Sequence, residues 1–355
     1  MSVRTFKKAA AAVCSFCLAA AMLTSCADTT YICKSGDKSI NAGVFIYYVM
    51  SQINEQTYAY YQSNGKMSED IVNEKYGDGT MTVGDFAHED AYSSCQRLMC
   101  TMLKFDELGL SFTDDEKQEI KDVVEANWDP EYYESIGIAK SSIEQIQTGL
   151  EMYEKIFYAY YGEGGTNAVT DSDINTFIKD NYVRFKLISI VKAEGKEAEA
   201  KATADEYAKM AEEKSFDEVI KEYKEKTAAE NGSSSSAEDE EDTDNNIMVN
   251  KNSSSYADNE VVKYITTGMN NGDIKTYEDD NYWYVIEKLD VTDYPEYVEK
   301  NRDSLLQEMK TDEFEEMIDG WVNDAQIEQN SDAFSRYSAE KVYDKYLDYQ
   351  EDQAK

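Results

Sequence analysis

Residues 182–191 read YVRFKLISIV, in which apolar and polar side chains largely alternate as in a β-strand. On either side of this stretch, apolar residues recur mainly at helical spacing. The sequence then predicts helices over 198–213 and 216–224, a short strand over 247–249, a helix over 259–266 and a closing strand over 282–289. This order of elements predicts a small α+β domain over residues 181–292.

Helical segments flank the predicted α+β domain. Apolar residues recur at helical spacing through residues 41–180, and Asn41 is a suitable N-cap for the first helix. From Pro295 onward the pattern is helical again and carries an apolar stripe. The sequence therefore predicts an α+β protein with a helical module over 41–180 and a C-terminal helical segment over 293–355.

Two helix starts inside the module have the spacing of a capping box. In this motif a Ser or Thr at the N-cap and a Glu three residues later bond each other's backbone N–H. Thr113 with Glu116 and Ser141 with Glu144 have this spacing. We therefore expect helices to begin directly after Thr113 and Ser141.

The first 25 residues have the parts of a secretory signal peptide. Basic residues precede an apolar run from Ala9 to Leu23, which is shorter than the roughly 20 residues that a membrane-spanning helix needs. The run ends in Leu23–Cys26, which resembles the lipobox of bacterial lipoproteins. We expect cleavage before Cys26, lipid attachment to its sulfur, and a tether and lead-in over residues 26–40. A simple secretory signal, the alternative, would also place the protein outside the cell.

The chain is strongly acidic, with a formal net charge of −37. Such a surface repels phosphate backbones, and no basic cluster offsets the repulsion, so the composition excludes nucleic-acid binding. The acidic excess is interpreted as a solvated surface that keeps the protein soluble.

Residues 231–246 combine serines with a run of five acidic residues. This composition cannot bury enough apolar surface to offset the entropy of chain ordering, so the sequence predicts a disordered acidic loop. A calcium site there is the disfavoured alternative, because the glycine spacing of an EF-hand loop is missing. No metal site and no cofactor is predicted.

Three cysteines remain after Cys26: Cys33, Cys95 and Cys100. Their spacing fits no metal site, and buried free thiols are the favoured interpretation. A bridge from Cys33 to one of the other two stays open as an alternative in an oxidising compartment. The single histidine, His88, falls in the helical module and is interpreted as a solvated helix residue.

Several motifs in the same order resemble the extracytoplasmic foldases of the PrsA and SurA type. The matching segments are residues 38–45, 107–113, 182–190, 216–223, 269–274 and 282–289. The resemblance implies a SurA- and trigger-factor-like helical chaperone module and an inserted parvulin-type prolyl isomerase domain. It also implies a C-terminal helix that packs back on the helical module.

The chain departs from active parvulins at the positions that carry their histidines. Leu187 stands at the first histidine position, and the second falls at Tyr284 or Val285, depending on a one-residue choice of alignment. The acidic loop replaces the glycine-rich segment of the family, and His88 lies in another part of the chain. We therefore expect a degenerate parvulin pocket with no catalytic residue.

The favoured function is an ATP-independent chaperone, anchored through lipidated Cys26 to the outer face of a bacterial cytoplasmic membrane. Its expected partners are unfolded or exported polypeptides, which tyrosine, phenylalanine and methionine side chains can accommodate. A working prolyl isomerase with unusual pocket residues is one alternative. A solute-binding lipoprotein is another, and it would require alternating strands and helices in two lobes. The sequence does not indicate an oligomeric state.

Replacing Cys26 by Ala should block lipidation and lipoprotein processing, because the lipid is joined through the cysteine sulfur. Cell fractionation and intact mass should then show uncleaved or released protein in place of the mature membrane form. An unchanged mature mass together with unchanged membrane attachment would contradict the prediction.

Overall fold

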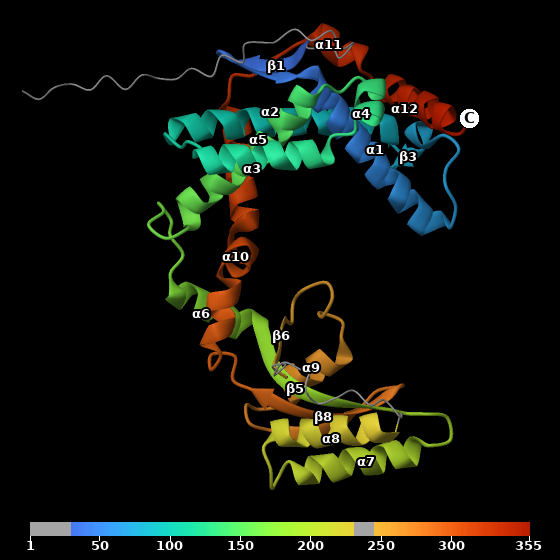
Figure 1. Ribbon diagram of the computed structural model, residues 1–355, viewed down its shortest axis with the longest axis vertical. Helices are drawn as coiled ribbons and strands as arrows, with labels where there is room; N and C mark the ends of the chain where they lie inside the picture. The colour runs from blue at the N-terminus through green and yellow to red at the C-terminus, as the bar shows by residue number, and fades with distance from the viewer. Residues whose placement is uncertain (1–29, 231–244) are drawn as a thin grey trace, which may run out of the picture. The chain divides into compact units, whose positions relative to one another are not determined.

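A computed structural model describes residues 30–230 and 245–355 of the chain and divides them into two compact units. The described part of unit 1 covers residues 30–156 and Ile318–Lys355, and unit 2 covers Phe157–Met317. The boundaries fall inside two long helices, α5 (Lys140–Tyr161) and α10 (Pro295–Asp324) (Figure 1). By packing, unit 2 is therefore larger than the α+β domain that sequence patterns place at 181–292.

Unit 1 is mostly helical. Besides the parts of α5 and α10 that it contains, its elements are β1 (Tyr31–Ser35), β2 (Lys38–Asn41), α1 (Ala42–Asn64), the 3₁₀ turn η1 (Ile71–Asn73), β3 (Lys75–Tyr76), β4 (Met81–Thr82), α2 (Val83–Glu107), α3 (Asp114–Asn127), α4 (Pro130–Ile136), β9 (Glu328–Gln329), α11 (Ser331–Arg336) and α12 (Ala339–Gln353).

A short sheet joins the two ends of the described chain in unit 1. β1 pairs antiparallel with β2 on one side and with β9 on the other (Figure 1). Gly36 forms the tight β1–β2 turn with φ +61°, a conformation that costs glycine little. Residues 31–41, which the sequence analysis left mostly as lead-in, therefore form a hairpin. The C-terminal segment packs on the helical module, as the resemblance implied.

The capping-box predictions have different outcomes. Thr113 caps α3, and both reciprocal bonds with Glu116 are present, so that prediction is confirmed. The prediction for Ser141 is wrong, because α5 begins at Lys140 and Ser141 lies inside its first turn. The neighbouring Ser142 is 1% exposed and faces Gly43 of α1, where a Cβ would lie 2.4 Å from its Oγ. This close approach ties the first turn of α5 to α1.

His88 is half-buried rather than solvated, so that expectation is wrong. Its Nε2 lies 3.0 Å from the backbone oxygen of Phe334, and the His88 ring is centred 4.1 Å from the Phe334 ring. The ring of Phe45 meets it edge-on at 5.1 Å. The C-terminal segment covers this helix face, which the α2 sequence by itself does not reveal. Burial lowers the pKa of His88.

The three remaining cysteines are free and at most 2% exposed, which agrees with the favoured interpretation. Burial raises the pKa of Cys33 to about 12 and raises that of Cys95 well above its ordinary value. All three thiols therefore stay protonated at neutral pH.

Unit 2 contains one antiparallel sheet with helices on both faces. Besides the ends of α5 and α10, its elements are α6 (Asp171–Asn181), β5 (Tyr182–Val191), α7 (Glu197–Met210), α8 (Phe216–Glu230), β6 (Ile247–Asn250), α9 (Glu260–Gly268), β7 (Ile274–Glu278) and β8 (Tyr282–Leu289). The strand order is β6-β5-β8-β7, so the stretch quoted first is a central strand. β7 was not among the predicted strands.

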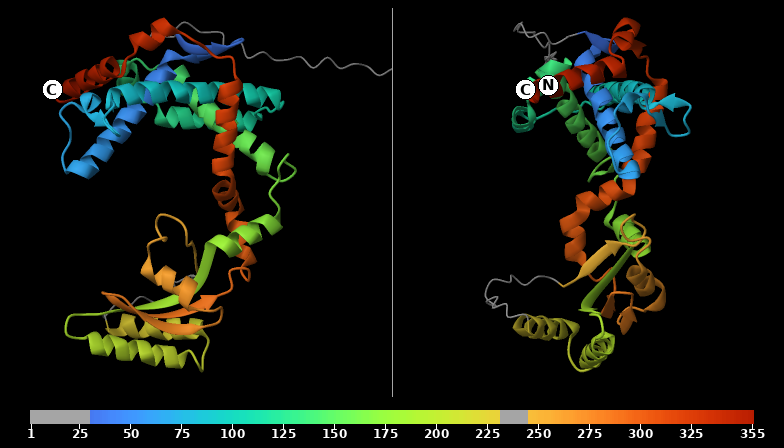
Figure 2. Two further views of the ribbon diagram at one scale, coloured as in Figure 1. Left: turned by 180° about the vertical axis from the view of Figure 1, so that it is seen from behind. Right: turned by 90° about the vertical axis from the view of Figure 1, so that its right-hand side faces the viewer.

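The two faces of this sheet have separate cores. Ile188 and Ile190 of β5 pack with Val285 of β8 against α7 and α8. Val183 and Phe185 pack on the opposite face, against α9. Figures 1 and 2 show α7 and α8 on one side of the sheet and α9 on the other. The fold class is thus α+β, as predicted.

As the pH is lowered below about 6.5, the ordinary pKa of histidine, the free energy of unfolding should decrease, in part because of His88. The pKa of His88 is lower in the folded than in the unfolded protein, so the unfolded chain binds more protons in this window. The stabilisation is complete above the unfolded-state pKa and is lost as pH falls through the folded-state value. One proton changes the slope by at most about 1.4 kcal/mol per pH unit.

His88→Phe keeps an aromatic ring but removes the titrating group. Urea unfolding of both proteins between pH 5 and 7.5 should therefore give a shallower pH slope for the variant. Identical slopes would show that His88 does not titrate differently in the two states.

Candidate functional site

The structure distinguishes the two residues proposed for the second parvulin histidine position. Leu187 of β5 lies on the sheet face covered by α9, and Tyr284 of β8 lies on the same face. Val285 lies on the other face, is 0% exposed and belongs to the core under α7 and α8. Of the two alignments, the one that selects Tyr284 therefore places both positions on one surface.

Tyrosines surround Tyr284 on this face. The Tyr284 hydroxyl donates a hydrogen bond to Oδ2 of Asp279 at 2.8 Å. Tyr264 of α9 stacks on Tyr277 of β7 with ring centroids 4.6 Å apart, and Tyr277 lies 6.4 Å from Tyr284. Partial burial, followed by the bond to Asp279, raises the pKa of Tyr284, so its phenol remains a neutral hydrogen-bond donor.

This face offers little for acid–base chemistry near neutral pH. Leu187 has no polar group, and a tyrosine with a raised pKa releases its proton only in strong base. No cluster of three or more histidine, cysteine or carboxylate side chains able to hold a metal occurs in residues 30–230 and 245–355. A pocket without catalytic residues stays a prediction.

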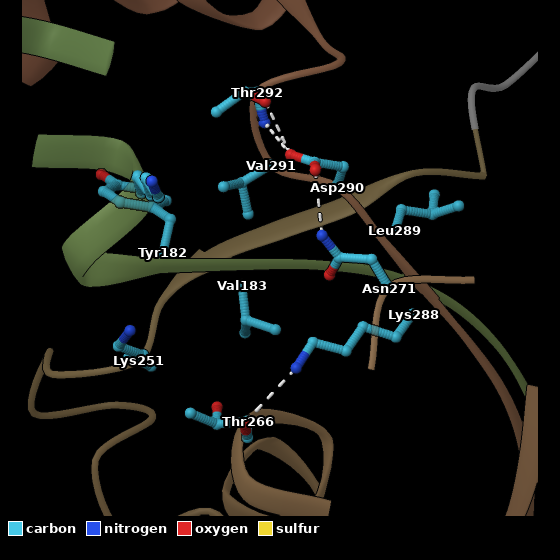
Figure 3. A pocket seen from close by; sticks show the side chains of 11 residues that line it. Tyr182, Val183, Lys251, Thr266, Asn271, Lys288, Leu289, Asp290, Val291 and Thr292 are labelled. Carbon is cyan, nitrogen blue, oxygen red and sulfur yellow. Dashed lines mark hydrogen bonds between the residues drawn. The ribbon is translucent and has the colours of Figure 1, made fainter. Parts of the chain in front are cut away.

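A second candidate for a functional site is a pocket of about 310 Å³ within unit 2. It lies where β5 begins and β8 ends, away from Tyr284 and Asp279. Figure 3 shows residues from α6, β5, the end of β6, α9 and the end of β8 around it. Its lining residues are Lys179, Tyr182, Val183, Lys251, Thr266, Asn271, Lys288, Leu289, Asp290, Val291 and Thr292. Three lysines therefore line one pocket in a chain that is acidic overall.

Lys288 serves the fold as well as the pocket. Its Nζ donates to the carbonyl oxygens of Ile265 at 2.8 Å, Thr266 at 3.3 Å and Met269 at 2.7 Å. A cation that bonds the last carbonyls of a helix stabilises the helix end. Burial, followed by the charge of Lys251, lowers the pKa of Lys288.

The single carboxylate lining the pocket is already bonded. Asp290 accepts from the hydroxyl of Thr292 at 2.7 Å, from its N–H at 2.9 Å and from Nδ2 of Asn271 at 3.0 Å (Figure 3). These bonds, chiefly those from Thr292, hold the pKa of Asp290 below its usual range, and the charge of Lys179 adds to the effect. Asp290 is thus ionised and bonded within its own turn.

Arg184 fixes the rim of the pocket behind Asp290. Its guanidinium donates to the backbone oxygens of Asp290 at 3.1 Å and Asp293 at 2.9 Å, and to Oδ1 of Asn246 at 2.9 Å. It also lies 4.4 Å from the ring centre of Tyr294. The turn from β8 into α10 is therefore held by one cation.

The sequence analysis did not identify this pocket. Its residues are spread between positions 179 and 292 and belong to different elements, so no local motif connects them. The available signal was that Lys179, Lys251 and Lys288 each lie near the end of a helix or strand. Lysines at such positions are common on exposed surfaces, so they do not by themselves indicate a binding site.

Two predicted features lie outside the described residues. Cys26 is one, and residues 231–244 of the acidic loop are the other. Among the residues that the structure describes, no helix is both long and apolar enough to cross a bilayer. Lipid attachment and loop disorder remain predictions from the sequence.

Neither a protein-family model nor a curated protein sequence matches the chain. Solved structures of PrsA foldases are similar to it at low identity. Foldase protein PrsA from Lactococcus lactis has 12% identity and a TM-score of 0.35, over 89% of this chain and 99% of that chain. PrsA from Streptococcus pneumoniae str. Canada MDR_19A has 14% identity and a TM-score of 0.34, over 73% of this chain and 90% of that chain. PrsA from Bacillus subtilis has 14% identity and a TM-score of 0.26, over 74% of this chain and 95% of that chain. At these values the likeness assigns no role to any residue.

The full chain should not accelerate cis–trans isomerisation of a proline peptide, because Leu187 and Tyr284 stand where active parvulins have histidines. The measured rate should stay within about twofold of the uncatalysed rate. Uncatalysed isomerisation has a time constant of roughly tens to hundreds of seconds. Leu187→His should behave in the same way, since the facing tyrosine remains. An active parvulin at the same concentration is the positive control, and a comparable rate for this protein would overturn the prediction.

Proposed function

We propose that the protein is a lipid-anchored extracytoplasmic chaperone that holds unfolded segments of exported polypeptides, while its parvulin-like domain is catalytically silent. The resemblance in the sequence and the lipobox at Cys26 support the location and the class of partner. The distribution of exposed apolar side chains supports client holding by unit 1.

Large apolar side chains are exposed chiefly in unit 1. In the part of the chain that the structure describes, the exposed set is Tyr58, Tyr61, Met67, Leu108, Leu150, Val191 and Leu347. Every member except Val191 belongs to unit 1. Single exposed apolar residues are ordinary on protein surfaces, whereas residues gathered in one region mark interaction sites.

The C-terminal end of α1 is the strongest candidate for client contact. The last buried residue of this helix is Ile53, although the helix continues to Asn64. Tyr58 is 66% exposed, and Met67, in the loop after the helix, is 59% exposed. Within unit 1 the end of α1 projects beyond the neighbouring helices in both face-on views (Figures 1 and 2). Flexible Met and amphipathic Tyr side chains can accommodate many sequences, which a chaperone requires.

The alternatives have less support. A working prolyl isomerase would lack histidine on the face that holds Leu187 and Tyr284, since His88 is the only histidine in the sequence. A solute-binding lipoprotein would need alternating strands and helices in two lobes, whereas the four-stranded sheet of unit 2 is antiparallel and the sheets of unit 1 are short.

Replacing Tyr58, Tyr61 and Met67 together by Ser should weaken protection of an unfolded client. Full burial of one such side chain contributes roughly 1.5 to 3 kcal/mol, and about 1.4 kcal/mol is a factor of ten in affinity. Even partial burial of these side chains against a client therefore predicts that at least about tenfold more protein is needed for equal suppression of aggregation. The variant should remain folded, because these side chains are exposed in the native state. Light scattering of a denatured test protein measures the effect, and circular dichroism checks the fold.

Val191→Ser is the matched control, since Val191 is 63% exposed but lies at the end of β5 in unit 2. It should leave protection unchanged. Full protection by the triple variant would place client binding elsewhere in the protein.

A further inference from the structure

The lysine pocket of unit 2 lacks a carboxylate that pairs with its cations. In the described residues, neither the Lys179 nor the Lys251 side chain makes a hydrogen bond or ion pair, whereas Asp290 and Lys288 are both hydrogen-bonded. The nearby carboxylate of Glu308 is bonded by the Tyr182 hydroxyl and by Nδ2 of Asn250. The charge of Lys251 lies close enough to Lys288 to lower its pKa, and an anion beside Lys251 would offset this repulsion.

We propose that this pocket binds the carboxylate of a polypeptide, at its C-terminus or on an acidic side chain, through Lys179 and Lys251. Ammonium–carboxylate hydrogen bonds are stronger than neutral ones. Lys288 stays on the carbonyl oxygens at the end of α9 and contributes positive potential rather than a direct bond.

The remaining walls of the pocket favour an organic acid over a bare inorganic anion. Val183, Leu289 and Val291 line it beside the lysines, so aliphatic carbon next to the carboxylate can be buried at the same time. The volume of about 310 Å³ lies at the lower end of the range for small-ligand sites and fits one residue of a peptide.

The lysines of the pocket have a competing explanation, namely that they stabilise the fold. This explanation applies to Lys288 alone. Lys288 closes the end of α9, whereas Lys179 is exposed at the end of α6, where its charge lies beside Asp290 without an ion pair. Lys251 is half-buried in the turn after β6, where its backbone N–H, not its side chain, bonds Asn181. Lys179 and Lys251 are therefore available to a ligand.

Isothermal titration of the full chain tests the proposal with an N-acetylated tripeptide that ends in a free-acid valine. The same peptide with an amidated end should bind at least about tenfold more weakly, because it has lost its charge. An amidated tripeptide that contains glutamate tests the side-chain source of the carboxylate. Sodium phosphate tests whether any anion suffices.

Lys179→Gln and Lys251→Gln should each weaken binding of the carboxylate peptide by about tenfold, and Lys→Arg at either position should restore most of it. Lys121→Gln is the matched control, since Lys121 is exposed on α3 in unit 1 and the change in net charge is the same. Because Lys179 is exposed, its variant tests the site even if a change at Lys251 disturbs folding.

Saturable binding of a free-acid or glutamate peptide that depends on both lysines supports the proposal, and the stronger of the two peptides identifies the source. Three results would overturn it: no saturable binding of either peptide, equal binding by the glutamine variants, or binding of phosphate alone. Client holding by α1 does not require this pocket, so the two proposals can fail separately.

Discussion

Antiparallel pairing of β5 with β8 determines the arrangement of the functional residues in unit 2. The register joins residues 184–191 to residues 282–289 without interruption. Because side chains alternate between the faces of a strand, this register places Leu187 and Tyr284 on the α9 side and sends Val285 into the opposite core. A slip by one residue would reverse every assignment. It would also move Lys288 away from the carbonyl oxygens that it bonds at the end of α9.

Unit 1 depends on a different constraint, the return of the C-terminal segment. β9 adds a strand to the hairpin at the start of the described chain, and Phe334 packs on His88 and Phe45. These contacts join positions about 250 to 300 residues apart, so unit 1 is complete only after nearly the whole chain has been made. Contacts of such long range form slowly, because loop closure has to occur before they stabilise the fold.

Local sequence patterns predicted most of the helices and strands. The features that they did not predict depend on contacts between distant parts of the sequence. The alternation in residues 182–191 and the capping box at Thr113 are local signals, and both elements were found. The misplaced start at Ser141, the buried state of His88 and the hairpin at residues 31–41 depend on partners elsewhere in the sequence. The position of Leu187 and Tyr284 on one face follows from alternation once the register is known. The lysine pocket does not, since it needs the turn after β8 and the ends of α6, β6 and α9 in place.

The acidic composition and the exposed apolar residues are physically compatible. A protein that exposes Tyr58, Tyr61 and Met67 risks association with its own copies. A net charge of −37 opposes that association over distances of about the Debye length, roughly 8 Å at physiological salt. The same charge would repel acidic segments from the proposed client surface at the end of α1 and favour basic or neutral apolar segments. The lysine-lined pocket of unit 2 is a local exception to this repulsion.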